Sequence, residues 1–148
     1  MARIIVSEDD FDVQAELKAL NLNGVGAIVN FIGVVRDHAS SPELTAMTLE
    51  HYPGMTEQEI EKIVDIAIER WALADVTVIH RVGRLKPQEN IVLVIAASAH
   101  RQAAFDGANY IMDYLKTRAP FWKCEETARG AVWVDAREAD ETALDKWS

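Results

Sequence analysis

An apolar run at residues 91–97 constrains the fold of this chain more than any other feature. The run is hydrophobic almost throughout, and a second apolar stretch precedes it at residues 76–82. Both have the length and composition of β-strands, joined through residues 83–90. A strand that is apolar on both sides needs cover on both faces of its sheet. The sequence therefore predicts a strand that is buried on both faces.

Two further segments have the periodicity of amphipathic helices. Apolar residues recur at helical spacing over residues 60–71, and Thr56 and Glu59 in front of them match a capping box. A second apolar stripe covers residues 105–115, in a helix that is bounded by Pro120. We expect the first helix to cover the sheet and the second to pack through its stripe.

The remaining segments complete a mixed order of elements. We expect a first helix capped by Asp9 or Asp10, strands at residues 25–33, 44–52 and 131–136, a loop over residues 36–42, and a helical end through Trp147. Because helices and strands do not alternate strictly, this order favours an α+β fold over a doubly wound parallel fold. The predicted architecture is a mixed, largely antiparallel sheet with covering helices.

Length and charge restrict the class of protein. At 148 residues the chain fits one domain, residues 1–148, with a core of its own. The formal net charge of −9 disfavours broad binding of nucleic acid or anionic membranes, which reward basic surfaces. The first residues lack the apolar core of a signal peptide, and no run approaches the ~20 apolar residues of a membrane span. We therefore expect a cytoplasmic protein.

Cysteine and histidine are too few and too scattered for the common metal sites. Cys124 is the single cysteine, which excludes an internal disulfide and a site with several thiolates. The four histidines show no paired ligand spacing. The chain has neither a complete dinucleotide fingerprint nor a P-loop. We expect no metal and no cofactor.

Positive side chains nevertheless gather in one part of this acidic chain. Lys116, Arg118 and Lys123 flank Pro120 and the aromatic pair that follows it. The chain as a whole has 24 Asp and Glu against 15 Lys and Arg, so a local excess of cations stands out. The cluster predicts a site for an anionic small molecule.

Three other residues are candidates for the same site. His100 and Arg101 stand where the apolar strand passes into the second helix, and a helix start has free amides that favour anions. Arginine adds a two-pronged donor for phosphate or carboxylate, and histidine can also transfer a proton. Arg36 lies at the exit of a predicted strand, where ligands are often bound. His80 falls inside a predicted strand, and we expect it to be structural.

Each candidate also has a simpler structural explanation. Lys116 can serve only to stabilise the negative end of its helix, and Lys123 can be a surface lysine beside a structural tryptophan. His100 can be a buried, hydrogen-bonded side chain and Arg101 the partner of a surface carboxylate. Cys124 can be a thiolate favoured by its lysine neighbour or an incidental thiol, and we favour the incidental thiol.

Five segments resemble those of a known family, the large (catalytic) subunit of molybdopterin synthase. They read NFIGVVRDH at residues 30–38, LEHYPGM at 49–55, VIHRVG at 78–83, SAHR at 98–101 and YIMDYLKTRAPFWKCE at 110–125. The segments keep the family order and are spread over nearly the whole chain. The last of them is long and distinctive.

The resemblance implies an α+β subunit with a hammerhead-like β portion, which forms a homodimer within a heterotetramer. In this family each large subunit binds one small ubiquitin-like subunit, whose C-terminal Gly-Gly tail carries a thiocarboxylate and threads into a pocket. The tail delivers sulfur to cyclic pyranopterin monophosphate, also called precursor Z. Two such transfers give the dithiolene of molybdopterin.

The resemblance also assigns roles by position. Lys116 and Lys123 match the catalytic lysines of the family, and Arg36, His100 and Arg101 match its contacts to the substrate anion. The other residues assigned to the pocket by resemblance are Val34, Val35, Cys124 and Glu125, partly through backbone groups, and Arg137, which resembles an arginine lent across the dimer interface.

The predicted residues suit this chemistry. Arginine, histidine and lysine together can hold a phosphate and an incoming thiocarboxylate without a metal. Lys116 then acts as an acid/base or carbonyl-polarising group and Lys123 helps to hold the phosphate or the tail, while a covalent lysine adduct is a second route. Two other functions stay open: a non-catalytic docking module for the ubiquitin-like partner, and a metal-independent phosphoester hydrolase.

Overall fold

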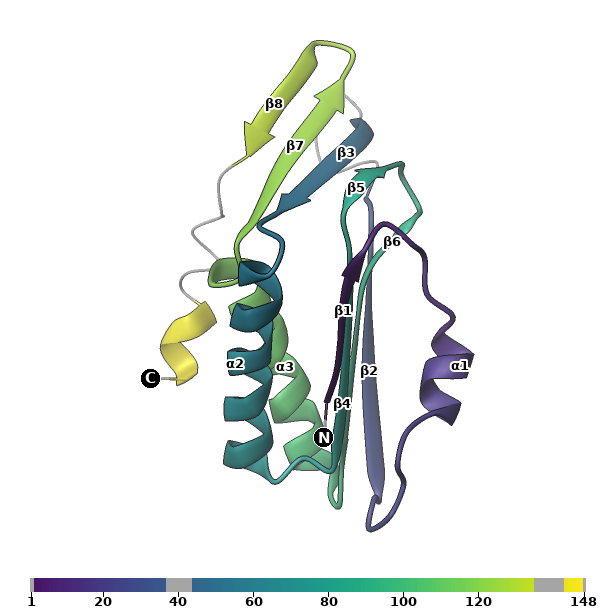
Figure 1. Cartoon of the computed structure of the whole chain (residues 1–148), viewed down its shortest axis with the longest axis vertical. Helices are drawn as coiled ribbons and strands as arrows, with labels where there is room; N and C mark the ends of the chain where they lie inside the picture. Colours follow the sequence, from purple (N-terminus) through teal and green to yellow (C-terminus); the bar gives the residue numbers. More distant parts are fainter. Residues whose placement is uncertain (1, 37–43, 135–142, 148) are drawn as a thin grey trace.

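Two four-stranded sheets form the framework of the protein in the computed structural model, which describes residues 2–36, 44–134 and 143–147. Their strand orders are β1-β4-β6-β2 and β5-β3-β7-β8 (Figure 1). The strands are β1 (Ala2–Ser7), β2 (Ala27–Val34), β3 (Leu44–His51), β4 (Asp75–Arg81), β5 (Gly83–Leu85), β6 (Asn90–Ser98), β7 (Phe121–Thr127) and β8 (Gly130–Val134). The helices are α1 (Val13–Lys18), α2 (Met55–Trp71) and α3 (Arg101–Thr117), followed by the 3₁₀ turn η1 (Leu144–Trp147).

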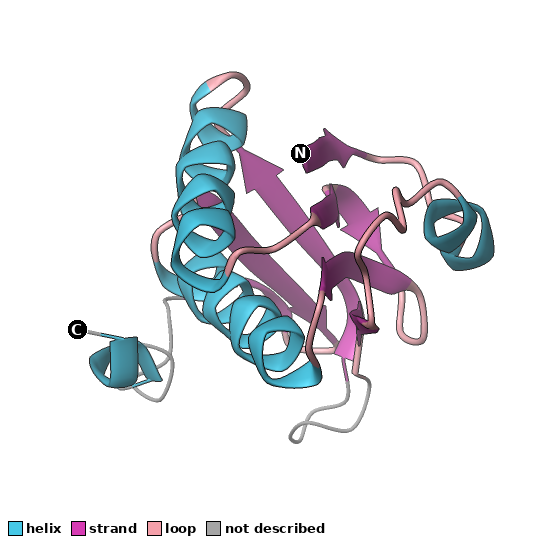
Figure 2. Ribbon diagram, turned by 90° about the horizontal axis from the view of Figure 1, so that it is seen from below, coloured by secondary structure: helices cyan, strands magenta, loops and turns pink. Residues whose placement is uncertain are grey.

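Strand β6 lies inside the first sheet and is covered on both faces. It pairs antiparallel with β4 and β2, and β1 completes the sheet by pairing parallel with β4. Helices α2 and α3 cover one face, and α1 covers the other (Figure 1, Figure 2). Val92 and Val94 pack under the two long helices, whereas Leu93 and Ile95 pack under α1. The strand that the apolar run predicted is confirmed, as is the α+β class.

The second sheet is antiparallel throughout and forms the hammerhead-like β portion that the resemblance implied. Strand β3 lies between β5 and β7, and β8 forms the other edge. The hydrophobic pattern predicted one mixed sheet, and the structure divides the strands between two. The pattern shows which faces of a strand are buried, but it does not show which strands pair.

Helix α2 begins at Met55, just before the expected start. Its N-cap is Gly54, whose φ of 87° lies in the left-handed region that favours glycine. Glu57 accepts the hydrogen bond from the Gly54 amide at 3.0 Å, in the role that the sequence had assigned to Glu59. The expected position of the cap was therefore wrong by two residues, because glycine rather than threonine makes the turn into this helix.

Thr56 instead bonds the start of α2 to the turn after α3. Its buried hydroxyl accepts from the amide of Tyr52 at 2.9 Å and donates to the carbonyl of Pro120 at 2.9 Å. Residues 64 positions apart are thereby held together.

Three other local expectations were wrong. Strand β1 was not expected, because its register is set by β4, about 70 residues further along the chain. Helix α1 takes Asp12 as its N-cap, not Asp9 or Asp10, since only the Asp12 carboxylate accepts from a backbone amide of its first turn. Phe105 on α3 points away from the core and is 58% exposed.

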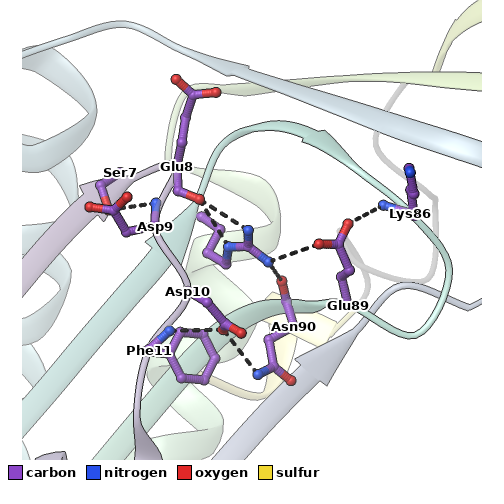
Figure 3. A network of polar contacts seen from close by, with 9 residues as sticks. Ser7, Glu8, Asp9, Asp10, Phe11, Lys86, Glu89 and Asn90 are labelled. Carbon is purple, nitrogen blue, oxygen red and sulfur yellow. Dashed lines mark hydrogen bonds and ion pairs between the residues drawn. The ribbon is translucent and has the colours of Figure 1, made fainter.

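The buried guanidinium of Arg81 ties β4 to the segment that follows β1. It donates to the carbonyl of Glu8 from Nε (3.2 Å) and Nη2 (3.0 Å), and to the carbonyl of Asn90 from Nη1 (3.0 Å). The side-chain amide of Asn90 donates to Asp10 at 3.1 Å and so lowers the pKa of this carboxyl. Figure 3 shows Glu8, Asp10 and Asn90 around this network. The edge strand is thus held by polar contacts as well as by its ladder.

Trp147 anchors the last described turn on the two long helices. Its ring packs edge-on against Trp71 and Tyr110, with ring centroids 5.4 Å and 5.5 Å away. Its indole N–H donates to Asp113 at 2.7 Å, and Arg70 donates to its carbonyl at 3.1 Å. The helical end that the sequence predicted is a 3₁₀ turn.

An aromatic stack joins the two sheets. The imidazole of His80 on β4 lies nearly parallel to the ring of Phe121 on β7, with centroids 4.0 Å apart and 20° between the planes. Burial lowers the pKa of His80 to about 4, and Coulombic interactions with Lys116 and His51 act in the same direction. The ring is therefore neutral at pH 7.

Replacing Thr56 by valine should lower the free energy of unfolding by about 1–3 kcal/mol. Valine has nearly the same shape, but it leaves the amide of Tyr52 and the carbonyl of Pro120 without their partner. Thr56→Ser is the matched control, because it keeps the hydroxyl and loses only a methyl group, at a cost of roughly 1 kcal/mol. Urea unfolding measures both, and a valine variant as stable as the serine variant would contradict the assignment.

Acid should weaken the fold through His80. Its pKa falls from 6.5 to about 4 on folding, so between these values the unfolded chain binds the proton more strongly. The contribution of His80 to the free energy of unfolding is fully present above pH 6.5. As the pH falls toward 4, about 3 kcal/mol of this contribution is lost. Urea unfolding at pH 7 and pH 4.5 should show that the free energy of unfolding decreases more for the wild type than for His80→Phe. Equal slopes would exclude this source of acid sensitivity.

Candidate active site

A cavity of about 530 Å³ lies where both sheets meet the carboxyl end of α3. This volume is within the range of small-molecule sites in proteins. Its wall is mostly apolar, with Phe31, Met112 and Leu115 among the lining residues. The charged and titratable side chains of the lining are Arg36, His80, Lys116, Lys123 and Glu125.

The turn at Pro120 places two lysines on this cavity. Lys116 stands in the last turn of α3, and Lys123 lies near the start of β7. The hydrogen bond from Thr56 fixes the turn between them. The two amines therefore reach the same space from a helix and from a strand, and the structure brings together the two lysines that the sequence singled out.

Alternation along β7 decides which of its residues face the cavity. Phe121, Lys123 and Glu125 all line it. Trp122 and Cys124 fall between them and point to the opposite face of the strand, as successive strand residues must. The thiol of Cys124 is therefore directed away from the lysines, and a contribution from its backbone stays a prediction.

A β-bulge aims the end of β2 at the same cavity. The register between β2 and β6 shifts just before Val34, and a bulge of this kind bends its strand. The amide of Val35 then donates to the carbonyl of Glu89 at 2.9 Å, and its carbonyl accepts from the amide of Gln88 at 2.8 Å. With this backbone fixed, Val34, Val35 and Arg36 all line the cavity.

The lining carries an excess of positive charge in a protein whose net charge is −9. Arg36, Lys116 and Lys123 supply three cations, and Glu125 supplies one carboxylate. In the part of the chain that the structure describes, the Lys116 ammonium has neither a hydrogen-bond partner nor an ion-pair partner. An anion that enters the cavity can therefore gain charge-assisted hydrogen bonds without displacing a carboxylate from this amine.

His80, which the sequence predicted to be structural, is also among the residues that line the cavity, a position that sequence reasoning did not predict. Its Nδ1 lies 2.8 Å from the carbonyl of Arg81, and since a carbonyl only accepts, Nδ1 carries the proton. The sequence does contain one indication of this position, a polar residue in an apolar stripe. Val76 and Val78 face the core from the same side of β4, and a histidine two residues further interrupts this apolar stripe.

His100 and Arg101 lie at the other end of α3 from Lys116. His100 is the N-cap of the helix, Arg101 is its first residue, and both are exposed. At 1.5 Å per residue, the helix rises about 22 Å between Arg101 and Lys116. Within one chain these two residues do not line the cavity. Arg137 and His38 lie outside the described residues.

Residues 2–36, 44–134 and 143–147 lack both a clustered set of metal ligands and a membrane-spanning helix. These residues contain no group of three or more His, Cys, Asp or Glu side chains that could hold a metal ion. None of their helices has the length and apolar character needed to cross a bilayer.

Comparison with known proteins gives a consistent family. The model of the family "MoaE protein" matches residues 6–118. A relative from Ralstonia nicotianae, named "Molybdopterin synthase catalytic subunit", is 54% identical over 149 residues, which cover 99% of this chain and 85% of the relative.

Solved structures agree with this match. The MoaE protein from Burkholderia ambifaria MC40-6 superposes with a TM-score of 0.84 at 49% identity, over 99% of this chain and 98% of that chain. The complex of subunits 1 and 2 of molybdopterin-converting factor from Helicobacter pylori 26695 contains a chain with the same fold, with a TM-score of 0.71 at 19% identity, over 92% of this chain and 91% of that chain. On the family match and the high identity to its relatives, the chain belongs to the MoaE family, the catalytic subunits of molybdopterin synthase.

Proposed function

We propose that this chain is the sulfur-transferring subunit of a molybdopterin synthase. It converts cyclic pyranopterin monophosphate to molybdopterin with two sulfurs, which a small ubiquitin-like subunit delivers as its C-terminal thiocarboxylate. The observation that carries the proposal is the convergence of Lys116, Lys123 and Arg36 on one cavity of an otherwise acidic protein. Family membership and the name of the Ralstonia relative support the same reaction.

Both reactants are anions, and the lining suits them. The guanidinium of Arg36 offers two parallel donors to a phosphate, which a lysine cannot do. The apolar wall, with Phe31 and Met112, offers a surface for the flat pterin ring. A reactant that fills the cavity displaces water from this lining, and each charge-assisted bond is then stronger than it would be in bulk solvent.

The two lysines take different roles in this proposal. In each transfer the thiocarboxylate sulfur bonds to a side-chain carbon of the pterin as that carbon loses its bond to an oxygen, which leaves as a phosphate oxygen or as water. Water then adds to the acyl carbon and the acyl carbon–sulfur bond breaks, so that the tail leaves as a carboxylate and the sulfur stays on the pterin as a thiolate. Negative charge develops on the acyl oxygen in that step, and the Lys116 ammonium stabilises it or supplies a proton. Lys123, half-buried on β7 beside Glu125, holds the phosphate or the tail.

The names of the relatives also support a protein partner for this chain. The Ralstonia relative is named as one subunit of a synthase, and the Helicobacter structure is a complex of two subunits. We infer that a small subunit with a Gly-Gly tail binds this chain with its tail in the cavity. We place the reaction in the cytoplasm, which cell fractionation would test.

His100 and Arg101 can contribute to a cavity only in another copy of the chain. They stand about 22 Å along α3 from Lys116, so we infer that they complete the cavity of a second copy of this chain. This fits the homodimer that the family resemblance implies, and we keep Arg137 as a predicted contact across the same interface.

Lys116→Ala should lower the rate of molybdopterin formation by at least 100-fold, the range expected when a proton donor or charge-stabilising group is lost. The assay mixes the variant with precursor Z and a thiocarboxylated small subunit, and the affinity for the small subunit should stay unchanged. Lys62→Ala is the control, because Lys62 is also a helical lysine but pairs with Glu59 on the surface. Full turnover by Lys116→Ala would favour the docking module over the enzyme.

Cys124→Ser should keep most of the activity in the same assay. The sulfur comes from the partner, and the thiol points to the opposite face of β7 from the lysines. Loss of sulfur transfer by a folded Cys124→Ser protein would show that the proposed route of the sulfur is wrong.

A further inference from the structure

A histidine on the wall of the cavity departs from the pattern of its strand. Val76 and Val78, on the same face of β4 as His80, are buried under α2 and α3. A third apolar residue would continue this stripe with no polar atom to satisfy, whereas an imidazole must find partners for two ring nitrogens. Such a local departure at the wall of a site indicates a function for the side chain.

Two contacts hold the ring in one orientation. Nδ1 of His80 donates to the carbonyl of Arg81 at 2.8 Å, and the ring lies flat on Phe121, with centroids 4.0 Å apart. With the proton on Nδ1, the neutral ring keeps its lone pair on Nε2. Within the described residues, Nε2 has no hydrogen-bond partner, yet no buried polar side-chain atom is left unsatisfied. Nε2 is therefore open to the cavity rather than sealed in the core.

Lys116 carries the complementary group. Its ammonium has three donors on a flexible stem, lines the same cavity, and has no hydrogen-bond or ion-pair partner in the described part of the chain. The two side chains are close enough for the charge of Lys116 to lower the pKa of His80. A free acceptor and a free donor thus face the same space.

The other titratable groups around the ring do not offer the same combination. Arg36 and Lys123 are donors only, and His51 lies on β3 outside the lining. Glu125 on β7 is an acceptor, but its negative charge would cancel the positive charge of the amine that it bound. A neutral imidazole can hold an ammonium and leave its charge available to the substrate.

We propose that His80 is a positioning residue for Lys116, whose ammonium donates a hydrogen bond to Nε2 during the reaction and is thereby aimed at the reacting group. The inference rests on the proposed function, in which Lys116 acts on the acyl oxygen or supplies a proton. His80 itself neither gains nor loses a proton in this role.

Substitution of His80 by asparagine or glutamine distinguishes the contributions of its two ring nitrogens. His80→Asn places an amide N–H near the position of Nδ1, where it can keep the bond to Arg81, and has no atom at the position of Nε2. His80→Gln is long enough to return an acceptor oxygen to that position. We expect His80→Asn to reduce the single-turnover rate of sulfur transfer roughly 10- to 100-fold, the effect of a misplaced catalytic group, and His80→Gln to recover part of it.

Coupling to Lys116 distinguishes positioning from a general loss of structure. If His80 acts through Lys116, the double variant His80→Asn/Lys116→Ala is no slower than Lys116→Ala alone. The affinity for the small subunit stays that of the wild type in all variants. An additional 10-fold loss in the double variant would overturn the proposal.

Nitrogen NMR tests the hydrogen bond without an activity assay. In the complex with the small subunit, the Nε2 resonance of His80 should differ between the wild type and Lys116→Ala, because an acceptor nitrogen shifts when its bond is removed, while the ring of His51 should be unaffected. An identical Nε2 resonance would overturn the inference even if the position-80 variants failed to fold.

The outcomes also separate this inference from the proposed function. Full activity of His80→Asn beside an inactive Lys116→Ala protein would overturn the role of His80 and leave the proposed function standing. Full activity of Lys116→Ala would overturn the proposed function, and the NMR comparison would still decide whether His80 bonds the amine.

Discussion

The hydrogen bond from the Thr56 hydroxyl to the carbonyl of Pro120 ties the start of α2 to the junction of α3 and β7. Helix α3 packs on the first sheet, and β7 belongs to the second sheet. The chain therefore passes from one sheet to the other at this junction. Lys116 stands before it and Lys123 after it. The turn between the two lysines thus helps to set the relative position of their amines. The buried Thr56 hydroxyl donates a hydrogen bond to this turn and accepts another from the Tyr52 amide before α2.

The cavity shows how an acidic protein can handle anions. The chain has a net charge of −9, while three cations, a neutral imidazole and one carboxylate line the cavity. Salt largely screens interactions between exposed charges that lie more than about 10 Å apart, so distant surface charge has little influence on a reactant that is already in the cavity. Affinity for an anion is then a local property, set by Arg36 and the lysines, and the bulk composition is free to serve solubility.

The parts of the fold that the sequence predicted are those whose signal is local. Strand β6 and helix α2 followed from burial on both faces and from helical spacing, which are properties of the segments themselves. The partition into two sheets and the presence of β1 depend on pairing between distant segments, such as residues 2–7 with 76–81, which no local pattern encodes.

As with the fold, only those parts of the site that have a local signal could be predicted from the sequence. The cluster around Pro120 identified both lysines, and strand alternation could have separated Cys124 from them. The length of α3 could have shown that His100 lies far from Lys116 in one chain. The sequence predicted His80 to be structural, and its place on the cavity wall could not be predicted, because a strand position does not show which cavity lies beside it.

Strand β1 enters the first sheet at the end opposite the cavity. Ala2 pairs with Val76, whereas His80, on the cavity wall, pairs with Val6 near the other end of the strand (Figure 1). An affinity tag fused ahead of β1 would emerge at the end of the sheet where His100 and Arg101 begin α3, the residues that we place at the cavity of a second copy. Attaching the protein to a biosensor surface through such a tag would hold the assembly by that end, so a tag placed elsewhere suits a titration of the partner's tail better.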